Sequence, residues 1–198
     1  MKFKRDFYLN DTFEVAENLL GATLYSNINN ELTGGKIVEL EVYLGKKDKA
    51  SHAYGGRKTK RTGVMYHHGG KAYIYLIYGL YSLFNVVTGP EGEPHAILIR
   101  ALEPSHGIET LKKRRGINDL LNLASGPGKL CSALNITREQ NGIDLTGDTI
   151  WIVQPEKPVH ENNIVRAPRV GIDYAEEFAD KPWRFYIKEN PHVSIKLR

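Results

Sequence analysis

Two runs of alternating aromatic and aliphatic residues, separated by a glycine, constrain the fold of this chain more than any other feature. Residues 71–78 and 81–87 flank Gly79, and this pattern predicts two antiparallel strands joined by a tight turn. Tyrosines stand at four positions of the runs: 73, 75, 78 and 81. Buried strands normally use Val, Ile and Leu, because a buried tyrosine hydroxyl must find a hydrogen-bond partner. The hairpin is therefore either an aromatic core element or part of a site that holds a flat ring.

A strand predicted over residues 36–43 carries two acidic residues on one face. Glu39, Glu41 and Tyr43 share one parity, and the alternate positions are aliphatic. The acids are either ordinary solvated positions or, beside a pocket, candidates for a general base that activates a water. Arg100, near the end of another predicted strand, is a suitable guanidinium partner for such a carboxylate.

Composition bounds the class of protein. With 198 residues and 41 % hydrophobic content, residues 1–198 are expected to form a single domain with a substantial core. The formal charge is +4, and much of the basic excess falls within residues 46–61 and 112–115. These clusters are either phosphate-binding surfaces or solvated faces, with Arg57 and Lys58 as candidate phosphate contacts. The single cysteine, Cys131, excludes an intrachain disulfide and a cysteine-based zinc site, and we expect it in the core.

Targeting signals are not evident. The first residues lack the apolar stretch of a signal peptide. No run of the sequence approaches the ~20 apolar residues that a membrane span requires. We therefore expect an intracellular protein without membrane contacts, which would be cytoplasmic and nucleoid-associated in a bacterium or nuclear in a eukaryote.

Helix and turn signals accompany the strands. Asp11, followed by Glu14, predicts a helix start. The pair Gly34–Gly35 predicts a sharp turn before the acidic strand. Glu103–Pro104 is expected to end the strand that contains Arg100, and Ser105 is expected to cap the helix that follows. The proline-rich last third predicts irregular β structure packed on the main sheet, so the fold class is mixed α/β (α+β).

Histidines and a glycine-rich turn are the remaining candidates for chemistry. His52 and the adjacent His67–His68 do not have metal-ligand spacing, since neighbouring histidines on a strand point apart, and no metal site is predicted. Residues 125–129, Ser-Gly-Pro-Gly-Lys, resemble a turn that holds a phosphate at a helix start, with Gly126 and Lys129 as the contacts. The alternative is a simple turn with a helix cap.

Taken in order along the chain, these segments resemble the alkyladenine (3-methyladenine) DNA glycosylase family. The resemblance rests on residues 37–45, His52 with 55–57, 73–81 with Asn85, 97–104, 125–131 and 169–171. It implies a single mixed α/β domain with a curved antiparallel sheet flanked by helices, acting without a cofactor. The implied activity is monofunctional base excision repair. Damaged purines such as 3-methyladenine, 7-methylguanine, hypoxanthine and ethenoadenine would be flipped out of double-stranded DNA and released by hydrolysis, leaving an abasic site. A monomer is expected.

The resemblance also implies the roles of individual residues in catalysis and in opening the duplex. Glu41 matches the general base, Arg100 the arginine that helps to hold the water, and Val170 the residue whose carbonyl does the same. Tyr78 matches the side chain that is inserted into the duplex. Leu80 lies in the same insertion loop, at a position where a relative has Met.

Four further residues match the pocket for the flipped base. Tyr43, His52 and Tyr75 match its walls, and the backbone N–H of His52 matches a donor to the purine edge. Asn85 matches the residue that would clash with the 2-amino group of normal guanine.

Two other functions remain open on the sequence. One is a glycosylase with lyase activity that uses a lysine amine, although the carboxylate and tyrosine motifs contain no lysine. The other is a non-catalytic nucleic-acid binder whose tyrosines stack on bases. A binder has no need of a carboxylate that faces its pocket, so Glu41 distinguishes the two.

Overall fold

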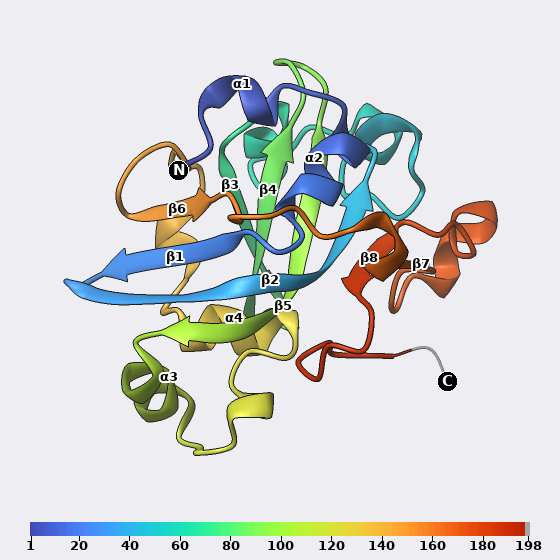
Figure 1. The fold of residues 1–198 in the computed structure, drawn as a ribbon. Helices are drawn as coiled ribbons and strands as arrows, with labels where there is room; N and C mark the ends of the chain where they lie inside the picture. Colours follow the sequence, from blue (N-terminus) through green and yellow to red (C-terminus); the bar gives the residue numbers. More distant parts are fainter. Residues whose placement is uncertain (197–198) are drawn as a thin grey trace.

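A curved antiparallel sheet forms the centre of the computed structural model, which describes residues 1–196 (Figure 1). Six strands follow the order β3-β4-β5-β2-β1-β6, and β8 pairs with both β2 and β7. The strands are β1 Thr23–Ile28, β2 Glu31–Tyr43, β3 Ala72–Ile77, β4 Tyr81–Thr88, β5 His95–His106, β6 Ile150–Val153, β7 Ile164–Ala167 and β8 Arg184–Ile187. This sheet and its flanking helices confirm the mixed α/β class predicted from the sequence.

The predicted tyrosine-rich hairpin is present as β3 and β4. Its register runs from Ala72 opposite Val86 to Ile77 opposite Tyr81. The turn between the strands needs left-handed backbone conformations, with φ of 53° at Tyr78 and 70° at Gly79. Glycine adopts such a conformation without steric cost, which explains why it stands at the tip.

Helices cover the sheet at several places. The α-helices are α1 Arg5–Tyr8, α2 Thr12–Leu19, α3 Ile108–Arg115 and α4 Pro127–Ala133. Short 3₁₀ helices are η1 Gly45–Lys47, η2 Tyr54–Gly56, η3 Gly63–Tyr66, η4 Leu120–Asn122, η5 Arg138–Gln140, η6 Glu161–Asn163 and η7 Asp173–Phe178. The predicted start of α2 is confirmed, because the Asp11 carboxylate accepts hydrogen bonds from the backbone N–H groups of Phe13 and Glu14.

Two boundary predictions were wrong. The pair Gly34–Gly35 is not a turn but lies inside β2, where a Cβ would meet the backbone oxygen of Leu24 or Glu103 at 2.8 Å. Glycine is needed there because the neighbouring strands approach closely. Strand β5 continues to His106, past the predicted stop at Pro104. Helix α3 therefore follows Gly107, whose φ is 65°, and Ser105 is not its cap.

The pairing of β2 with β5 is irregular next to the acidic residues. The register shifts on both sides of Glu39, so that Val38 on β2 and Arg100 on β5 have no directly opposite residue in this pair. One extra residue on each strand forms two opposed bulges, which bend the strands locally and re-aim side chains. Arg100 thereby lies beside the two acids of β2.

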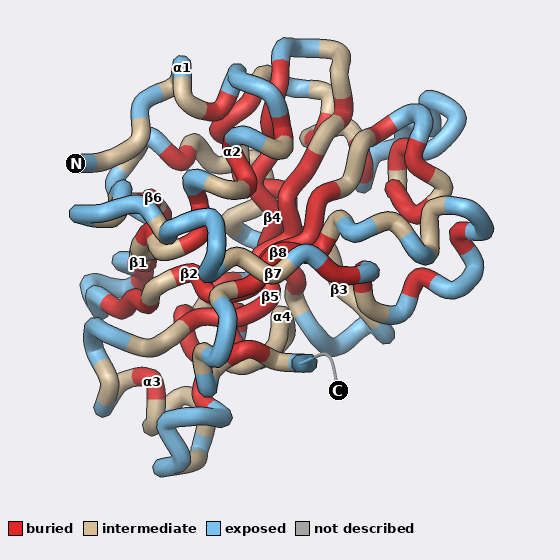
Figure 2. The backbone as a smooth tube through the Cα atoms, turned by 45° about the vertical axis from the view of Figure 1, so that its right-hand side comes forward, coloured by how far each residue is buried: buried red, intermediate tan, exposed pale blue. Residues whose placement is uncertain are grey.

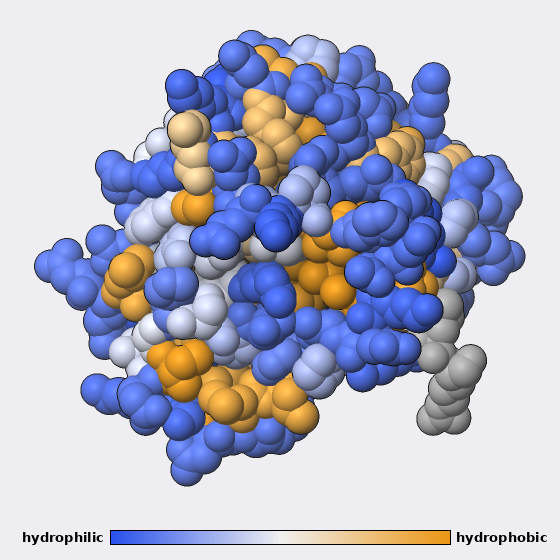
Figure 3. Space-filling view, in the orientation of Figure 1, coloured by the Kyte–Doolittle hydropathy of each residue, from blue (hydrophilic) through white to orange (hydrophobic). Residues whose placement is uncertain are grey.

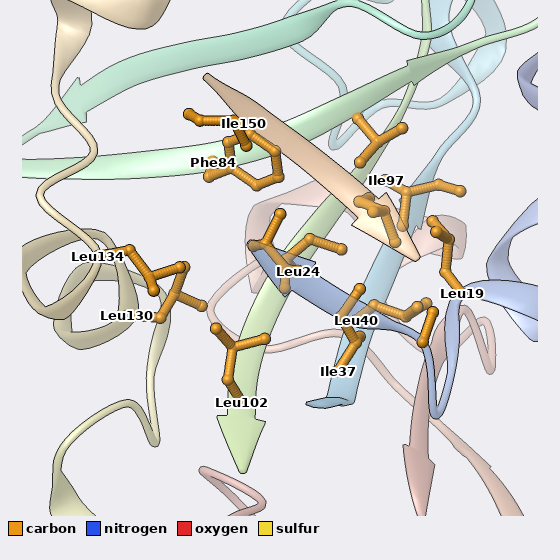
Figure 4. Packing of buried hydrophobic residues seen from close by; sticks show 14 of the residues in the cluster. Leu19, Leu24, Ile37, Leu40, Phe84, Ile97, Leu102, Leu130, Leu134 and Ile150 are labelled. Atoms are coloured by element: carbon orange, nitrogen blue, oxygen red, sulfur yellow. The ribbon is translucent and has the colours of Figure 1, made fainter. Parts of the chain in front are cut away.

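The main core fills the space between the sheet and its covering helices. Figure 4 shows Leu24, Ile37, Leu40, Phe84 and other aliphatic side chains packed together, and all four are buried. The buried stretches follow the central strands through the middle of the molecule (Figure 2). Cys131 is buried on α4 within this core, as the sequence predicts.

The surface is mainly hydrophilic, with hydrophobic patches separated from one another on the face shown (Figure 3). None of the helices within residues 1–196 has the length and apolar character to cross a membrane.

Candidate active site

A cavity of about 510 Å³ opens between the hairpin, strands β2 and β5, and two loops. All seven residues predicted to act in catalysis or in the base pocket line it: Glu41, Tyr43, His52, Tyr75, Asn85, Arg100 and Val170. The volume and the mixture of aromatic walls with a few polar groups are typical of a small-molecule or base-binding pocket.

Glu41 is fully buried, so the interpretation of this acid as a solvated strand position was wrong. One carboxylate oxygen accepts a hydrogen bond from the Tyr43 hydroxyl at 2.8 Å. The other accepts from the backbone N–H of Val170 at 2.8 Å and lies 3.2 Å from Nη1 of Arg100. Three donors from separate parts of the chain therefore hold this carboxylate in one orientation at the cavity wall.

Arg100 is almost entirely buried between two acids. Its Nε donates to Glu39 at 2.9 Å, while Nη1 faces Glu41. Burial alone would lower the pKa of Arg100, but the charges of Glu41 and Glu39 outweigh burial and raise it. The guanidinium therefore supplies a permanent positive charge beside the Glu41 carboxylate. Glu39 is also fully buried, which corrects its interpretation as a solvated position.

Aromatic rings form the walls of the cavity. The His52 and Tyr75 rings meet edge to face with centroids 4.5 Å apart, and the Tyr73 and Tyr75 centroids are 5.5 Å apart. Burial, and then the charge of Glu41, raise the pKa of Tyr43 well above its usual value. Burial likewise raises the pKa of Tyr75. Both phenols stay protonated at neutral pH and present neutral, electron-rich faces.

His52 is neutral at physiological pH. Burial, with a smaller effect from the nearby positive charges of Arg61 and Arg57, lowers its pKa to about 4. Its Nδ1 lies 2.9 Å from the hydroxyl of Tyr73, whose pKa burial raises to about 12. His67 and His68 lie in a loop before β3 rather than on a strand, which corrects the argument from strand geometry. Within residues 1–196, no cluster of three His, Cys, Asp or Glu side chains is arranged to hold a metal.

Some side chains of the β3–β4 hairpin are buried beside the cavity, and those at its tip are exposed to solvent. Asn85 is buried, and its amide group donates to the backbone oxygen of Tyr73 at 3.0 Å. Tyr73 itself packs in a small cluster with Met65 and other apolar residues, so the aromatic-core interpretation is correct for this one tyrosine. At the tip, Tyr78 is 85 % exposed although it also lines the cavity, and Leu80 is 76 % exposed.

The residues predicted to contact a DNA backbone lie outside the cavity. Arg57 and Lys58 are exposed in the loop after η2. Gly126 directly precedes α4, and Lys129 on that helix donates to Asn122 at 3.0 Å. In the second basic cluster, Arg114 instead pairs with Glu31, and Arg115 donates to the Leu123 carbonyl. These two arginines stabilise the fold, so the cluster is not simply a solvated or phosphate-binding face.

A buried ion pair between Asp48 and Arg169 lies behind Tyr43 and was not predicted from the sequence. Arg169 donates to both carboxylate oxygens of Asp48, at 2.6 and 2.9 Å, and both side chains are fully buried. The guanidinium lies 4.6 Å from the Tyr43 ring centroid and 4.9 Å from that of Trp183. Asp48 is the one acid in a strongly basic stretch, which was the available signal. Its partner is 121 positions away, so spacing did not reveal it.

Arg61 and Tyr174 also line the cavity and were not predicted. The Arg61 guanidinium lies 6.0 Å from the Tyr75 ring centroid, at the outer limit of a cation–π contact. Tyr174 is 69 % exposed. Arg61 belongs to the basic stretch of residues 46–61, but neither residue lies in a motif that predicts a position in a pocket.

An aromatic-walled cavity with a buried carboxylate and an arginine at its wall is suited to holding a planar ring beside a candidate general base. Residues 6–191 match the family described as Methylpurine-DNA glycosylase (MPG), and the chain belongs to that family. It is therefore a DNA glycosylase, a hydrolase of DNA repair.

Relatives of similar length support this membership. A protein of Clostridium acetobutylicum is 52 % identical, with 98 % of each chain covered. A protein of Bacillus cytotoxicus is 48 % identical over 98 % of this chain and 100 % of its own. A third, from Alkaliphilus oremlandii, is 48 % identical over 99 % of this chain and 100 % of its own. Each of the three is named "Putative 3-methyladenine DNA glycosylase".

Proposed function

We propose that this chain flips damaged purines out of double-stranded DNA and hydrolyses their N-glycosidic bond with a water activated by Glu41. The observation that carries the proposal is the buried Glu41 carboxylate, held by Tyr43, Arg100 and Val170 at the wall of an aromatic cavity. The family membership and the relatives' names support a methylated purine in DNA as the substrate.

The first step is weak, salt-sensitive binding to the phosphate backbone. Exposed cations such as Arg57 and Lys58 neutralise phosphates, and the turn at Gly126 and Lys129 contributes further contacts. The exposed tip residues Tyr78 and Leu80 then enter the stack. Unstacking costs a few kcal/mol and costs least at damaged or mispaired bases, so this step already favours lesions.

The second step is recognition of the extruded base. A flat purine stacks between the rings of Tyr43, His52 and Tyr75, and a cationic alkylated purine interacts favourably with their electron-rich faces. Because His52 is neutral at pH 7, it does not repel such a cation. Asn85, which is buried at the cavity wall, is proposed to clash with the 2-amino group of normal guanine and so to exclude that base.

The third step is hydrolysis. Glu41 removes a proton from the water, whose oxygen forms a bond to C1′ of the sugar. The bond from C1′ to the purine nitrogen breaks, and its electron pair leaves with the base. Arg100 and the carbonyl of Val170 hold the water, in this proposal. An alkylated base already carries positive charge and leaves readily, whereas the neutral bases hypoxanthine and ethenoadenine require protonation or a hydrogen-bond donor.

The lyase alternative requires an amine at the sugar. No lysine is among the residues that line the cavity in the described part of the chain, which supports water rather than an amine as the nucleophile. The enzyme is proposed to act as a monomer.

An abasic-site assay tests the proposal. The purified protein is incubated with duplexes that contain one 7-methylguanine, hypoxanthine or ethenoadenine, and strand breaks are measured before and after alkali. We expect breaks only after alkali and no DNA adduct after borohydride treatment. A borohydride-trapped adduct would identify a lyase, and lesion binding without abasic sites would identify a non-catalytic binder.

A further inference from the structure

Glu39 is a fully buried acid that lies two positions before Glu41 and does not line the cavity. Its carboxylate accepts three hydrogen bonds: from Nε of Arg100 at 2.9 Å, from Nη1 of Arg184 at 3.1 Å and from the backbone N–H of Ser194 at 2.6 Å. The proposed mechanism gives this group no part, yet burying a charge requires compensation by several partners.

We infer that Glu39 is a positioning residue that orients Arg100 toward Glu41, and that the segment around Ser194 completes this arrangement. The inference rests on the function proposed above. It adds a buried carboxylate and a C-terminal segment to the set of residues on which hydrolysis depends.

The contacts of Arg100 support this role. Its three nitrogens are directed to three different groups: Nε to Glu39, Nη1 to Glu41 and Nη2 to the Ser194 hydroxyl at 3.4 Å. A planar guanidinium with all three nitrogens engaged has one orientation. Without Glu39, the guanidinium is free to turn and bind Glu41 through two nitrogens, in competition with the water and with the other donors to that carboxylate.

Arg184 extends the arrangement to the second partner of Glu41. Besides Glu39, it donates from Nε to the carbonyl of Pro168 at 2.8 Å and from Nη1 to the carbonyl of Ile195 at 2.6 Å. Pro168 lies two residues before Val170, whose N–H donates to Glu41. Glu39 therefore supports both the arginine and the loop that hold the catalytic carboxylate.

Charge balance leads to the same conclusion. The buried group contains two carboxylates, Glu39 and Glu41, and two guanidiniums, Arg100 and Arg184. Neutralising Glu39 leaves one uncompensated positive charge, which draws Glu41 into a tighter ion pair and makes it a poorer proton acceptor. The expected defect is therefore in the hydrolytic step and not in DNA binding.

The test compares Glu39→Gln with the matched control Glu93→Gln, which alters an acid that pairs with Lys46 outside the cavity. The wild-type rate on alkylated duplex tests the proposed function by itself. We expect Glu39→Gln to lower the single-turnover excision rate by roughly 10- to 100-fold with unchanged affinity for lesion DNA. The control should keep its rate within about twofold, since a half-exposed pair contributes little.

A double-mutant cycle separates positioning from a general structural effect. If Glu39 acts through Arg100, adding Glu39→Gln to Arg100→Gln should lower the rate by no more than about threefold further. A wild-type rate in Glu39→Gln, or a full additional loss in the double variant, would overturn the inference while leaving the proposed function intact.

Ser194→Pro is a second variant, and it alters neither Glu39 nor Arg100. It tests the positioning role of Glu39 if Glu39→Gln does not fold. It removes both the N–H that binds Glu39 and the hydroxyl that accepts from Arg100. We expect a reduced excision rate with retained lesion binding. A wild-type rate in folded Ser194→Pro would contradict the role of the C-terminal segment and of the Glu39 arrangement.

Discussion

Replacing Asp48 with Asn should destabilise this protein more than any comparable change at its surface. Asp48 accepts two hydrogen bonds from Arg169, and both side chains are fully buried. The same carboxylate accepts from the backbone N–H groups of Leu44 at 3.2 Å and Ala50 at 3.0 Å. In Asp48→Asn, the amide NH₂ replaces one of these oxygens and faces N–H groups that are themselves donors. The Arg169 guanidinium also loses its counter-charge.

The size of the effect follows from this geometry. Removing one partner of a buried ion pair costs about 3–5 kcal/mol, because the remaining charge is left uncompensated. For a chain of about 200 residues, each kcal/mol shifts the melting temperature by about 2–4 °C, so we expect a decrease of roughly 6–20 °C. Arg169 also lies against the Tyr43 ring, so the pocket wall should loosen as well.

Thermal and urea unfolding of Asp48→Asn and Glu109→Gln measure this prediction directly. Glu109 also pairs with a basic residue, Lys112 at 2.8 Å, but its side chain is 84 % exposed. The same change from carboxylate to amide should cost at most about 1 kcal/mol there. Equal stabilities of the two variants would refute the argument from burial.

Three further outcomes are expected. The pKa of His52 is lowered to about 4 in the folded protein, so between pH ~6.5 and ~4 the unfolded chain binds one more proton than the folded chain. The free energy of unfolding should therefore decrease as the pH is lowered through this range, by up to roughly 3 kcal/mol. His52→Gln should remove this part of the acid destabilisation in urea unfolding at pH 7 and pH 4.5. Tyr78→Gly should leave stability equal or higher by about 1 kcal/mol, because φ at this position is 53°, yet should slow excision from duplex DNA. Unimpaired duplex activity would remove Tyr78 from the insertion role. Asn85→Ser should relax discrimination against guanine-type bases, measured as relative excision rates across purines, and unchanged ratios would remove Asn85 from selectivity.

The local parts of the fold were predictable from the sequence. The β3–β4 hairpin follows from two alternating runs around Gly79, and the start of α2 follows from the Asp11 cap. These features depend on residues within one turn or one hairpin of each other. The turn predicted at Gly34–Gly35 was wrong for the opposite reason. These glycines are required by close neighbours on strands β1 and β5 and not by a local turn.

The candidate site was predictable only where a single motif or the family resemblance contained it. Glu41, Tyr43 and Tyr75 lie within such segments and do line one cavity. The buried acids around the site pair with arginines that are distant in the chain: Arg184 is 145 positions from Glu39, and Arg169 is 121 positions from Asp48. No periodicity or spacing rule connects such pairs, so burial of these charges became visible only in the structure.

The central claim is that Glu41 activates the water, and Glu41→Gln measured in single-turnover excision tests it most directly. The Gln side chain keeps the size and most hydrogen-bonding atoms of Glu41 but does not accept the proton. We expect unchanged affinity for lesion-containing duplex and an excision rate lower by on the order of 100-fold or more. A wild-type excision rate from the folded variant would contradict the account.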